Sequence, residues 1–291
     1  MAHIPTGRPG AAGPPDLQED LARLGRAAAG RWKSRGIFYP LLAVVVGFAA
    51  WYALIHLLKI PNYVLPPPEQ ILVELYNQSH LMLKHGWVTT YEAVAGFLLG
   101  VAIGVPCALL IVWSEPIGRA LMPLLIFSQT MPKVAIAPLF LLWFGFGIMP
   151  KVVVAFLICF FPIVISMVTG LKSVEREMLE LVHSMSASKL QVFMKARVPT
   201  SLPHLFSGLK VSITLSVIGA IVGEFVGADR GLGYLVLVAN GNVDTPFLFA
   251  ILMVLATIGF IMYGIIPFLE RIFIPWHAAV KTPEGKQEYT S

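Results

Sequence analysis

The sequence predicts an all-α, polytopic membrane protein with six transmembrane helices. Hydrophobic residues make up 57% of the chain, charged residues only 13%, and the mean hydropathy is +0.77, whereas roughly 25% of residues are charged in a soluble domain. Several apolar runs also exceed the ~18–20 residues that cross a bilayer core about 30 Å thick. The two cysteines, Cys107 and Cys159, fall inside apolar runs, so no disulfide framework or metal site is expected.

The first 36 residues predict a cytoplasmic tail rather than a cleaved signal peptide, because they are polar and rich in Gly, Pro and Ala. Residues 1–15 are expected to be disordered. Asp16 and Glu19 then have the spacing of a capping box. The apolar face and arginines that follow fit either an interfacial helix on anionic lipid or a basic tail that only sets orientation.

The transmembrane domain is expected at 37–274, followed by a polar cytoplasmic tail at 275–291. The predicted spans are 37–58, 88–113, 118–144, 151–171, 205–226 and 247–273. A short helix from Glu69 to Tyr76 is expected in the first polar connection, 59–87, after prolines that cannot continue a helix. The third span is expected to be interrupted at Pro123, Pro132 and Pro138, and a second polar connection is expected at 227–246.

The distribution of basic residues predicts the topology. With six spans, 16 of the 21 Lys and Arg residues fall on the side that carries both termini and the loop after the fourth span. Positive charge marks the cytoplasmic face, so both termini and this loop are expected in the cytoplasm of a cell with an inner membrane. The charge therefore reports topology and gives no reason to expect a nucleic-acid partner.

Glycines at a four-residue step predict close helix packing. They favour either contacts within one subunit or a subunit interface or moving gate, and they are Gly96, Gly100, Gly104, Gly219, Gly223 and Gly227. Polar residues inside spans are candidates for lining a translocation pathway: Gln129, Lys133, Ser212, Ser216 and Glu224. Lys133 could instead extend to the outer interface. Glu224 and Glu92 could instead have a structural role, as hydrogen-bond acceptors near the ends of their helices.

The longest polar interruption of the apolar sequence runs from Ser173 to Lys210. It combines acidic and basic residues with apolar residues at helical spacing, and such an amphipathic loop is suited to bind another protein. The segment expected to couple this chain to such a partner protein is 173–204.

This loop resembles the EAA loop of binding-protein-dependent ABC importer permeases. Glu180, Leu181 and Val182 occupy the Glu-Ala-Ala positions, Ser186 the Gly position, and Val198-Pro199 closes the motif. Three further segments resemble the nitrate, taurine and aliphatic-sulfonate subfamily: Leu65-Pro66-Pro67-Pro68-Glu69-Gln70-Ile71, Gly223-Glu224-Phe225-Val226-Gly227 and Gly231-Leu232-Gly233. Ser186 would pay about 1 kcal/mol in a left-handed turn, while Ser186 or Ser188 could start a second short helix.

The resemblance implies a type I importer (MetI-like) architecture and a non-catalytic subunit. A separate ATP-binding subunit would use ATP and Mg and dock on the loop. A second permease copy would complete the pathway in the lipid membrane. A solute-binding protein would deliver a small solute that is anionic or contains nitrogen or sulfur. The chain itself has no phosphate-binding loop and is expected to bind no cofactor. The implied ATPase-coupling residues are Glu180, Ser186, Ala187, Ser188, Leu190, Phe193 and Pro199, with Leu190 and Phe193 as anchors in the partner.

Two other classes of membrane protein fit the sequence less well. A stand-alone ion-coupled transporter would use Glu92, Lys133 and Glu224, but the inverted repeats typical of that class are not visible. An intramembrane enzyme would need a nucleophile with a spaced base, and none is present in the sequence.

Overall fold

The computed structural model describes residue 39 and residues 41–276 of the 291-residue chain. The chain divides into two compact units, residues 1–67 and 68–291. The expected N-terminal tail with its interfacial helix, and nearly all of the expected C-terminal tail, lie outside the described residues. In the first unit, the described residues include a helix of 18 residues, Leu41–Leu58, with a mean hydropathy of 2.2, which corresponds to the first predicted span.

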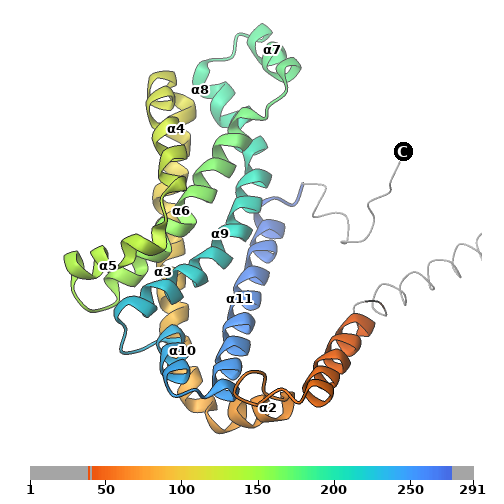
Figure 1. Cartoon of the computed structure of the whole chain (residues 1–291). Coiled ribbons are helices and arrows are strands. Elements are labelled where there is room, and N and C mark those ends of the chain that lie inside the picture. The colour runs from red at the N-terminus through yellow and green to blue at the C-terminus, as the bar shows by residue number, and fades with distance from the viewer. Residues whose placement is uncertain (1–38, 40, 277–291) are drawn as a thin grey trace, which may run out of the picture. The chain divides into compact units, whose positions relative to one another are not determined.

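The described part of the second unit is helical throughout, without a strand. Four long helices, α3, α6, α9 and α11, run side by side and form its core (Figure 1). The helices are α2 (Pro68–Asn77), α3 (Ser79–Trp113), α4 (Glu115–Thr130), α5 (Lys133–Phe144), α6 (Met149–Lys172), α7 (Arg176–Ser184), α8 (Lys189–Val192), the π-helical turn η1 (Phe193–Arg197), α9 (Val198–Gly227), α10 (Leu232–Gly241) and α11 (Thr245–Phe273). Among the described residues, five helices are long and apolar enough to cross a membrane, or six if the bent pair α4–α5 is one span.

Helix α6 lies at the centre of this core, with α3 on one side and α9 on another. The approach is close because glycines of α3 and α9 face small residues of α6. A Cβ added to Gly96 of α3 would lie 2.5 Å from the Ala155 Cβ, and one added to Gly219 of α9 would lie 2.6 Å from the Ala155 Cα. Without room for side chains at these positions, the three backbones pack directly, which is how helices associate in lipid.

The remaining glycines of the two series continue these contacts within the subunit. Gly100 and Gly104 face Cys159 and Ile163 of α6, and Gly223 faces the Lys151 backbone with 2.7 Å between an added Cβ and the Lys151 Cα. Gly227 instead faces the side chains of Leu141 and Phe146. On this evidence the glycines are packing positions of one subunit.

A methyl group at Gly96 should therefore be costly. We expect Gly96→Ala to destabilise the protein by about 1–3 kcal/mol, because α3 and α6 must separate. Denaturant titration in detergent micelles would measure the loss. Gly259→Ala is the matched control: nothing lies within 4 Å of its added Cβ, and the change should stay within about 1 kcal/mol of wild type. Equal stability of both variants would contradict the packing role of Gly96.

Three elements differ from the sequence prediction. Helix α3 begins at Ser79 rather than at residue 88, and its 35 residues span about 52 Å, more than the hydrocarbon core needs. Helix α9 begins at Val198 rather than at 205, since Pro199 occupies the first turn, where a missing N–H is tolerated. The connection 227–246 is not simply polar, because it contains the largely apolar helix α10, whose Leu232 is fully buried.

The third predicted span is broken only once. Helices α4 and α5 meet at an angle of 96°, with the break at Met131 and Pro132. Pro123 and Pro138 lie inside the two helices and do not interrupt them. No residue of α4 is fully buried within the described part of the subunit, although Leu121, Met122 and Leu125 pack against the core.

Candidate functional site

The loop between α6 and α9 folds into two short helices joined by a tight turn. Helix α7 ends at Ser184, and Ser186 follows with a φ of 54°, which is the left-handed conformation that a serine adopts at a cost. Of the two alternatives that the sequence left open for Ser186, the left-handed turn is the one in the structure. Its purpose is geometric, since it reverses the chain between α7 and α8.

Ser188 starts the second helix of the loop. Its side chain accepts a hydrogen bond of 3.3 Å from the Gln191 backbone N–H, and the Gln191 side chain accepts one of 2.8 Å from the Ser188 N–H. This reciprocal pair is a capping box, as the sequence suggested for Ser188. It fixes where α8 begins.

We expect Ser188→Ala to loosen the start of α8 by about 1 kcal/mol. Amide hydrogen exchange would report a roughly fivefold faster opening of residues 189–192, since local opening follows the local free energy. The exposed Ser184 caps no helix N-terminus and bonds the Leu181 carbonyl instead, so Ser184→Ala is the control and should leave α8 unchanged. Unchanged exchange in the Ser188 variant would refute the capping role.

The helix widens into a π-turn just before Pro199. In η1 the Val198 N–H bonds the Phe193 carbonyl, five residues earlier. A proline ring clashes with the carbonyl four residues before it, and a π-turn is a common local response to such strain. Pro199 thus continues the helix from the loop into α9 instead of ending it, and the loop is joined to the span by one continuous rod, Lys189–Gly227.

Phe193 is not an anchor on the outer face of the loop, and that prediction is wrong. The ring is buried against Trp113 at the end of α3, edge to face, with 5.1 Å between ring centroids. Lys189 covers the same Trp113 ring at 5.0 Å. Phe193 therefore fastens the loop to its own helical core, because an aromatic pair of this kind gains from both burial and ring geometry.

Leu190 by contrast is 58% exposed, beside the half-exposed Met194. A groove of about 400 Å³ separates α7 from α8 and η1, and Met178, Val182 and Met185 contribute its apolar wall. Ala187 lines the same groove, while Glu180 is exposed and forms no ion pair with any described residue. The loop thus offers an apolar surface beside an exposed acidic side chain, Glu180, which has no ion-pair partner in the described part of the chain.

A cluster of charged side chains lies inside the helical core near the other ends of these helices. Lys151 Nζ of α6 lies 3.0 Å from Glu92 Oε1 of α3, and both side chains are at most 5% exposed. Neither oxygen of Glu92 has a well-aligned hydrogen bond, so the attraction is mainly between charges. Glu224 of α9 is close enough to act on Glu92 and is also fully buried.

Glu224 caps helix α10. It accepts a hydrogen bond from the Gly233 N–H and one of 2.6 Å from the Thr89 hydroxyl. Thr89 in turn accepts one of 2.8 Å from the Leu232 N–H. Because the first N–H groups of a helix lack partners within it and carry partial positive charge, a carboxylate there both satisfies and neutralises the end of α10.

The turn before α10 requires glycine. Gly231 has a φ of 111°, and a Cβ there would collide with the Glu224 carboxyl group. The Gly231 N–H donates a hydrogen bond of 3.0 Å to His85 Nδ1. The predicted motif Gly231-Leu232-Gly233 thus lets backbone approach the side chains of α3 and α9.

The pathway residues expected from the sequence lie in two separate groups. Lys133 Nζ donates a hydrogen bond of 3.5 Å to the Gln129 carbonyl at the α4–α5 break, and the other three lie in the helical core. Ser212 and Ser216 are fully buried and bond the Cys159 and Ile213 carbonyls, at 3.1 and 2.8 Å. With Glu224 they are held within the core, so the prediction that these three line an open pathway is wrong for this structure. Gln129 is exposed at the end of α4, and Lys133 lies 4.7 Å from the centre of the Phe161 ring.

Sequence reasoning missed Lys151, His85 and Thr89. Lys151 was assigned to the end of a span, yet it is the cation that pairs with Glu92. A signal for the other two existed: His85, Thr89, Glu92 and Gly96 recur at helical spacing on one face of α3, which is typical of a face packed inside a bundle.

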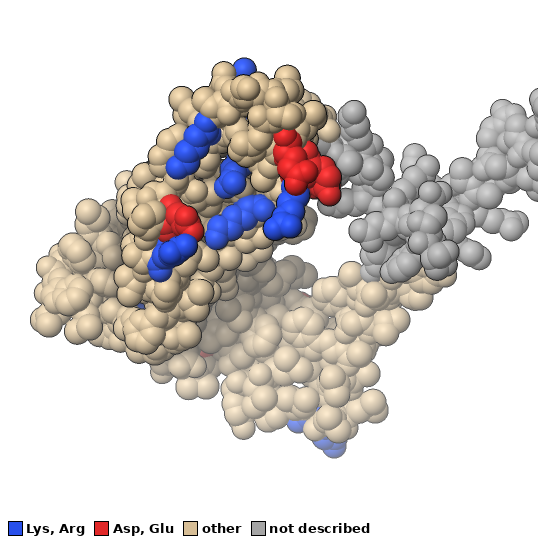
Figure 2. Space-filling model, turned by 90° about the horizontal axis from the view of Figure 1, so that it is seen from above, with Lys and Arg blue, Asp and Glu red and all other residues tan. Residues whose placement is uncertain are grey.

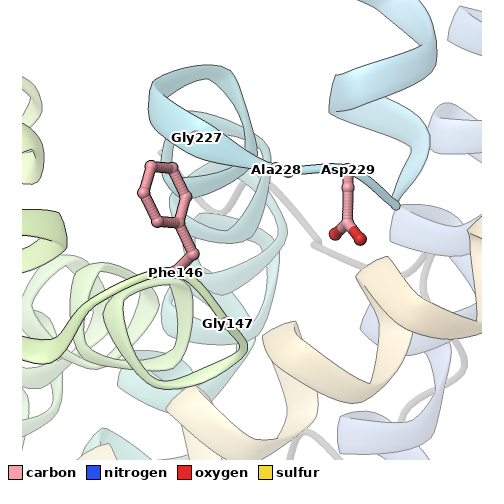
Figure 3. Close-up of a pocket in the computed structure, with 5 residues that line it drawn as sticks. All are labelled: Phe146, Gly147, Gly227, Ala228 and Asp229. Carbon is pink, nitrogen blue, oxygen red and sulfur yellow. The ribbon is translucent and has the colours of Figure 1, made fainter.

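At the same end of the molecule a pocket of about 460 Å³ opens between the α5–α6 turn and the α9–α10 connection. Its residues are Phe146, Gly147, Gly227, Ala228 and Asp229, and Figure 3 shows the Phe146 ring toward Gly227 while Asp229 points away. Asp229 is exposed beside Arg230, 3.6 Å away. The opposite, loop-bearing end differs, since Lys and Arg side chains gather on it (Figure 2).

Residues 98–273 match the protein family described as "Binding-protein-dependent transport system inner membrane component". The chain belongs to this family. It is therefore the membrane-spanning permease subunit of an ABC importer, a multi-pass inner membrane protein without catalytic activity of its own, and importers of this kind work with an ATPase and a binding protein.

Relatives agree with this assignment. The permease is 40% identical to the formylaminopyrimidine transport permease protein ThiX of Halalkalibacterium halodurans over 74% of this chain and 86% of that protein. It is 30% identical to the putative aliphatic sulfonates transport permease protein SsuC of Bacillus subtilis over 89% of this chain and 95% of that protein. The resemblance to the sulfonate-type subfamily is thus confirmed.

A solved structure shares the fold. A chain of the MetNI methionine ABC transporter, in an inward-facing conformation, superposes with a TM-score of 0.58 over 67% of this chain and 97% of that chain, at 18% identity. The expected MetI-like architecture is therefore confirmed.

Proposed function

We propose that the loop 173–204 is where the ATPase subunit docks, and that two copies of the permease enclose the pathway. The observation that carries this proposal is the loop itself: an exposed apolar groove and Leu190 on one side, and a rigid attachment to α3 and α9 through Phe193 and Pro199 on the other. A partner that moves this loop moves a helix which runs unbroken to Gly227. Rigid-body motion of packed helices is a common basis of switching.

In this proposal both termini and the loop face the cytoplasm, where the basic end shown in Figure 2 is favoured. The ATPase subunit uses ATP and Mg, and the permease binds neither. Helix α4, which has no buried residue, is the part offered to a second copy and to lipid. The end that carries Phe146 and Asp229 receives the solute from the binding protein.

The solute we propose is a small organic compound that contains nitrogen or sulfur. We rank aminopyrimidines ahead of sulfonates, because this chain is 40% identical to a formylaminopyrimidine permease and 30% identical to a putative sulfonate permease. The ion-coupled alternative is weaker, because Glu92 pairs with Lys151 and not with Lys133.

Reconstitution in proteoliposomes tests the proposal. The permease, its ATPase subunit and its binding protein should take up a labelled aminopyrimidine only with ATP inside, and a sulfonate less well. Uptake driven by a proton gradient without the ATPase subunit would overturn the proposed mechanism. Preference for the sulfonate would overturn only the choice of solute.

A further inference from the structure

A hollow of about 430 Å³ lies at the loop-bearing end of the helical core, where α3 turns into α4 and α6 ends. One side of it is basic and the other is apolar. The basic side chains are Arg119, Lys172 and Arg197, and the apolar ones are Ile111, Val112 and Met122. Glu115 is the one acidic residue in its lining.

The charges of this hollow are not balanced. Arg119 lies 2.5 Å from Glu115, but these side chains are 79% and 76% exposed, and such a pair contributes little and can be exchanged for another anion. Lys172 and Arg197 form no ion pair with any described residue. Three cations thus face one carboxylate. Other basic residues of the core differ: Lys151 and Lys210 are each paired with a glutamate, Lys210 with Glu270 at 2.7 Å.

The start of α4 adds to this field. Helix α4 has 16 residues, and its N-cap, Ser114, makes no side-chain capping bond. Gly118, in the first turn, lines the hollow. Because the N-terminal end of a helix carries partial positive charge, it favours a phosphate group.

The hollow lies where the apolar spans end. The long helices α3 and α6 end at Trp113 and Lys172, and Trp113 packs under Lys189, as aromatic residues do at the membrane–water interface. A group bound by Arg197 and Lys172 is therefore at headgroup level, with the apolar wall of Ile111 and Met122 beside it. Basic pockets between transmembrane helices bind anionic lipid headgroups.

We propose that this hollow binds the phosphate of an anionic phospholipid, with Lys172 and Arg197 as its main contacts and an acyl chain along Ile111 and Met122. Phosphate and basic side chains supply the attraction. The apolar wall favours a lipid over free phosphate or an acidic segment of the ATPase subunit, neither of which needs it. The site does not depend on which solute is carried.

The test uses the permease purified with its ATPase subunit in mild detergent, titrated with phosphatidylglycerol and followed by native mass spectrometry. Because each basic residue near a membrane surface contributes about 1 kcal/mol to the attraction of anionic lipid, Lys172→Gln/Arg197→Gln should weaken binding about 30-fold. Lys172→Arg/Arg197→Lys should retain binding, which separates loss of charge from loss of fold. Lys84→Gln removes an exposed lysine near the other end of α3 and should have no effect.

Three results would overturn the proposal. The first is a phosphatidylglycerol affinity that does not differ between Lys172→Gln/Arg197→Gln and the wild type, or that Lys84→Gln lowers just as much. The second is displacement of the lipid by millimolar inorganic phosphate, which would indicate a site for the free ion. The third is a cross-link from position 197 to the ATPase subunit that persists when phosphatidylglycerol is in excess, because the partner protein would then fill the hollow.

Discussion

Replacing Lys151 with methionine should destabilise the permease by about 3–5 kcal/mol, the usual cost of removing one member of a buried ion pair. The loss is expected because Glu92 and Glu224 are both fully buried, and Lys151 is the cation that pairs with Glu92. Burying a carboxylate without a partner is far more costly than losing the attraction itself. Unfolding of the purified permease by titration with a denaturing detergent would measure the difference.

A second substitution distinguishes charge from packing. In Lys151→Met/Glu92→Gln both members of the pair are neutral, and the side chains keep nearly the same length. We expect this double variant to recover most of the lost stability, since replacing a whole buried pair by neutral groups is often neutral or stabilising. Lys133→Met serves as the control: Lys133 contacts a ring but no carboxylate, and its loss should cost about 1 kcal/mol or less. A double variant as unstable as Lys151→Met would show that the shape of Lys151, and not its charge, matters.

The charged cluster of Glu92, Lys151 and Glu224 could be predicted only in part from the sequence. Glu92 and Glu224 were recognised as unusual because a carboxylate inside a span is costly. Their partner was not, since Lys151 follows a proline at the start of an apolar run and looks like a span end. Only the packing of α3 against α6 brings Lys151 beside Glu92, and no spacing within one helix encodes that contact.

The long apolar helices were predictable because membrane thickness fixes their length. The positions at which prolines break these helices were less predictable. Pro132 ends a helix whereas Pro123 and Pro138 do not, and the difference depends on whether neighbouring groups satisfy the freed carbonyl. Helix α10 was not predicted for two reasons. Glycine and charged residues surround its short apolar run, and the side chains that cap it come from helices distant in the sequence.

The loop was predicted in its local chemistry and misjudged in its orientation. The serine turn and the capping box depend on neighbours within four residues, so the sequence contains them. Which apolar residue faces inward depends on where α3 ends, because Trp113 at the end of α3 packs against Phe193. Leu190 is left as the exposed apolar residue of α8.

Leu190 is therefore where the loop should be most sensitive. We expect Leu190→Asp to lower ATP-dependent uptake by at least about 30-fold and to release the ATPase subunit during purification, since a truncated or charged residue at the centre of an interface costs about 2 kcal/mol or more and each 1.4 kcal/mol is a factor of ten. Stability of the permease alone should not change, because the Leu190 side chain is 58% exposed and lends little to the core. Uptake in proteoliposomes and co-purification of the ATPase subunit measure the two effects.

Ser184→Asp is the matched variant, because it adds the same charge to the exposed end of α7 without removing an apolar contact. It should reduce uptake severalfold at most. Phe193→Ala should behave differently from both, since removing a buried aromatic costs about 3–5 kcal/mol and loosens the loop from α3. If Leu190→Asp kept full uptake while Phe193→Ala abolished it at unchanged permease stability, the partner would have to contact Phe193 in a rearranged loop, and the docking surface proposed here would be wrong.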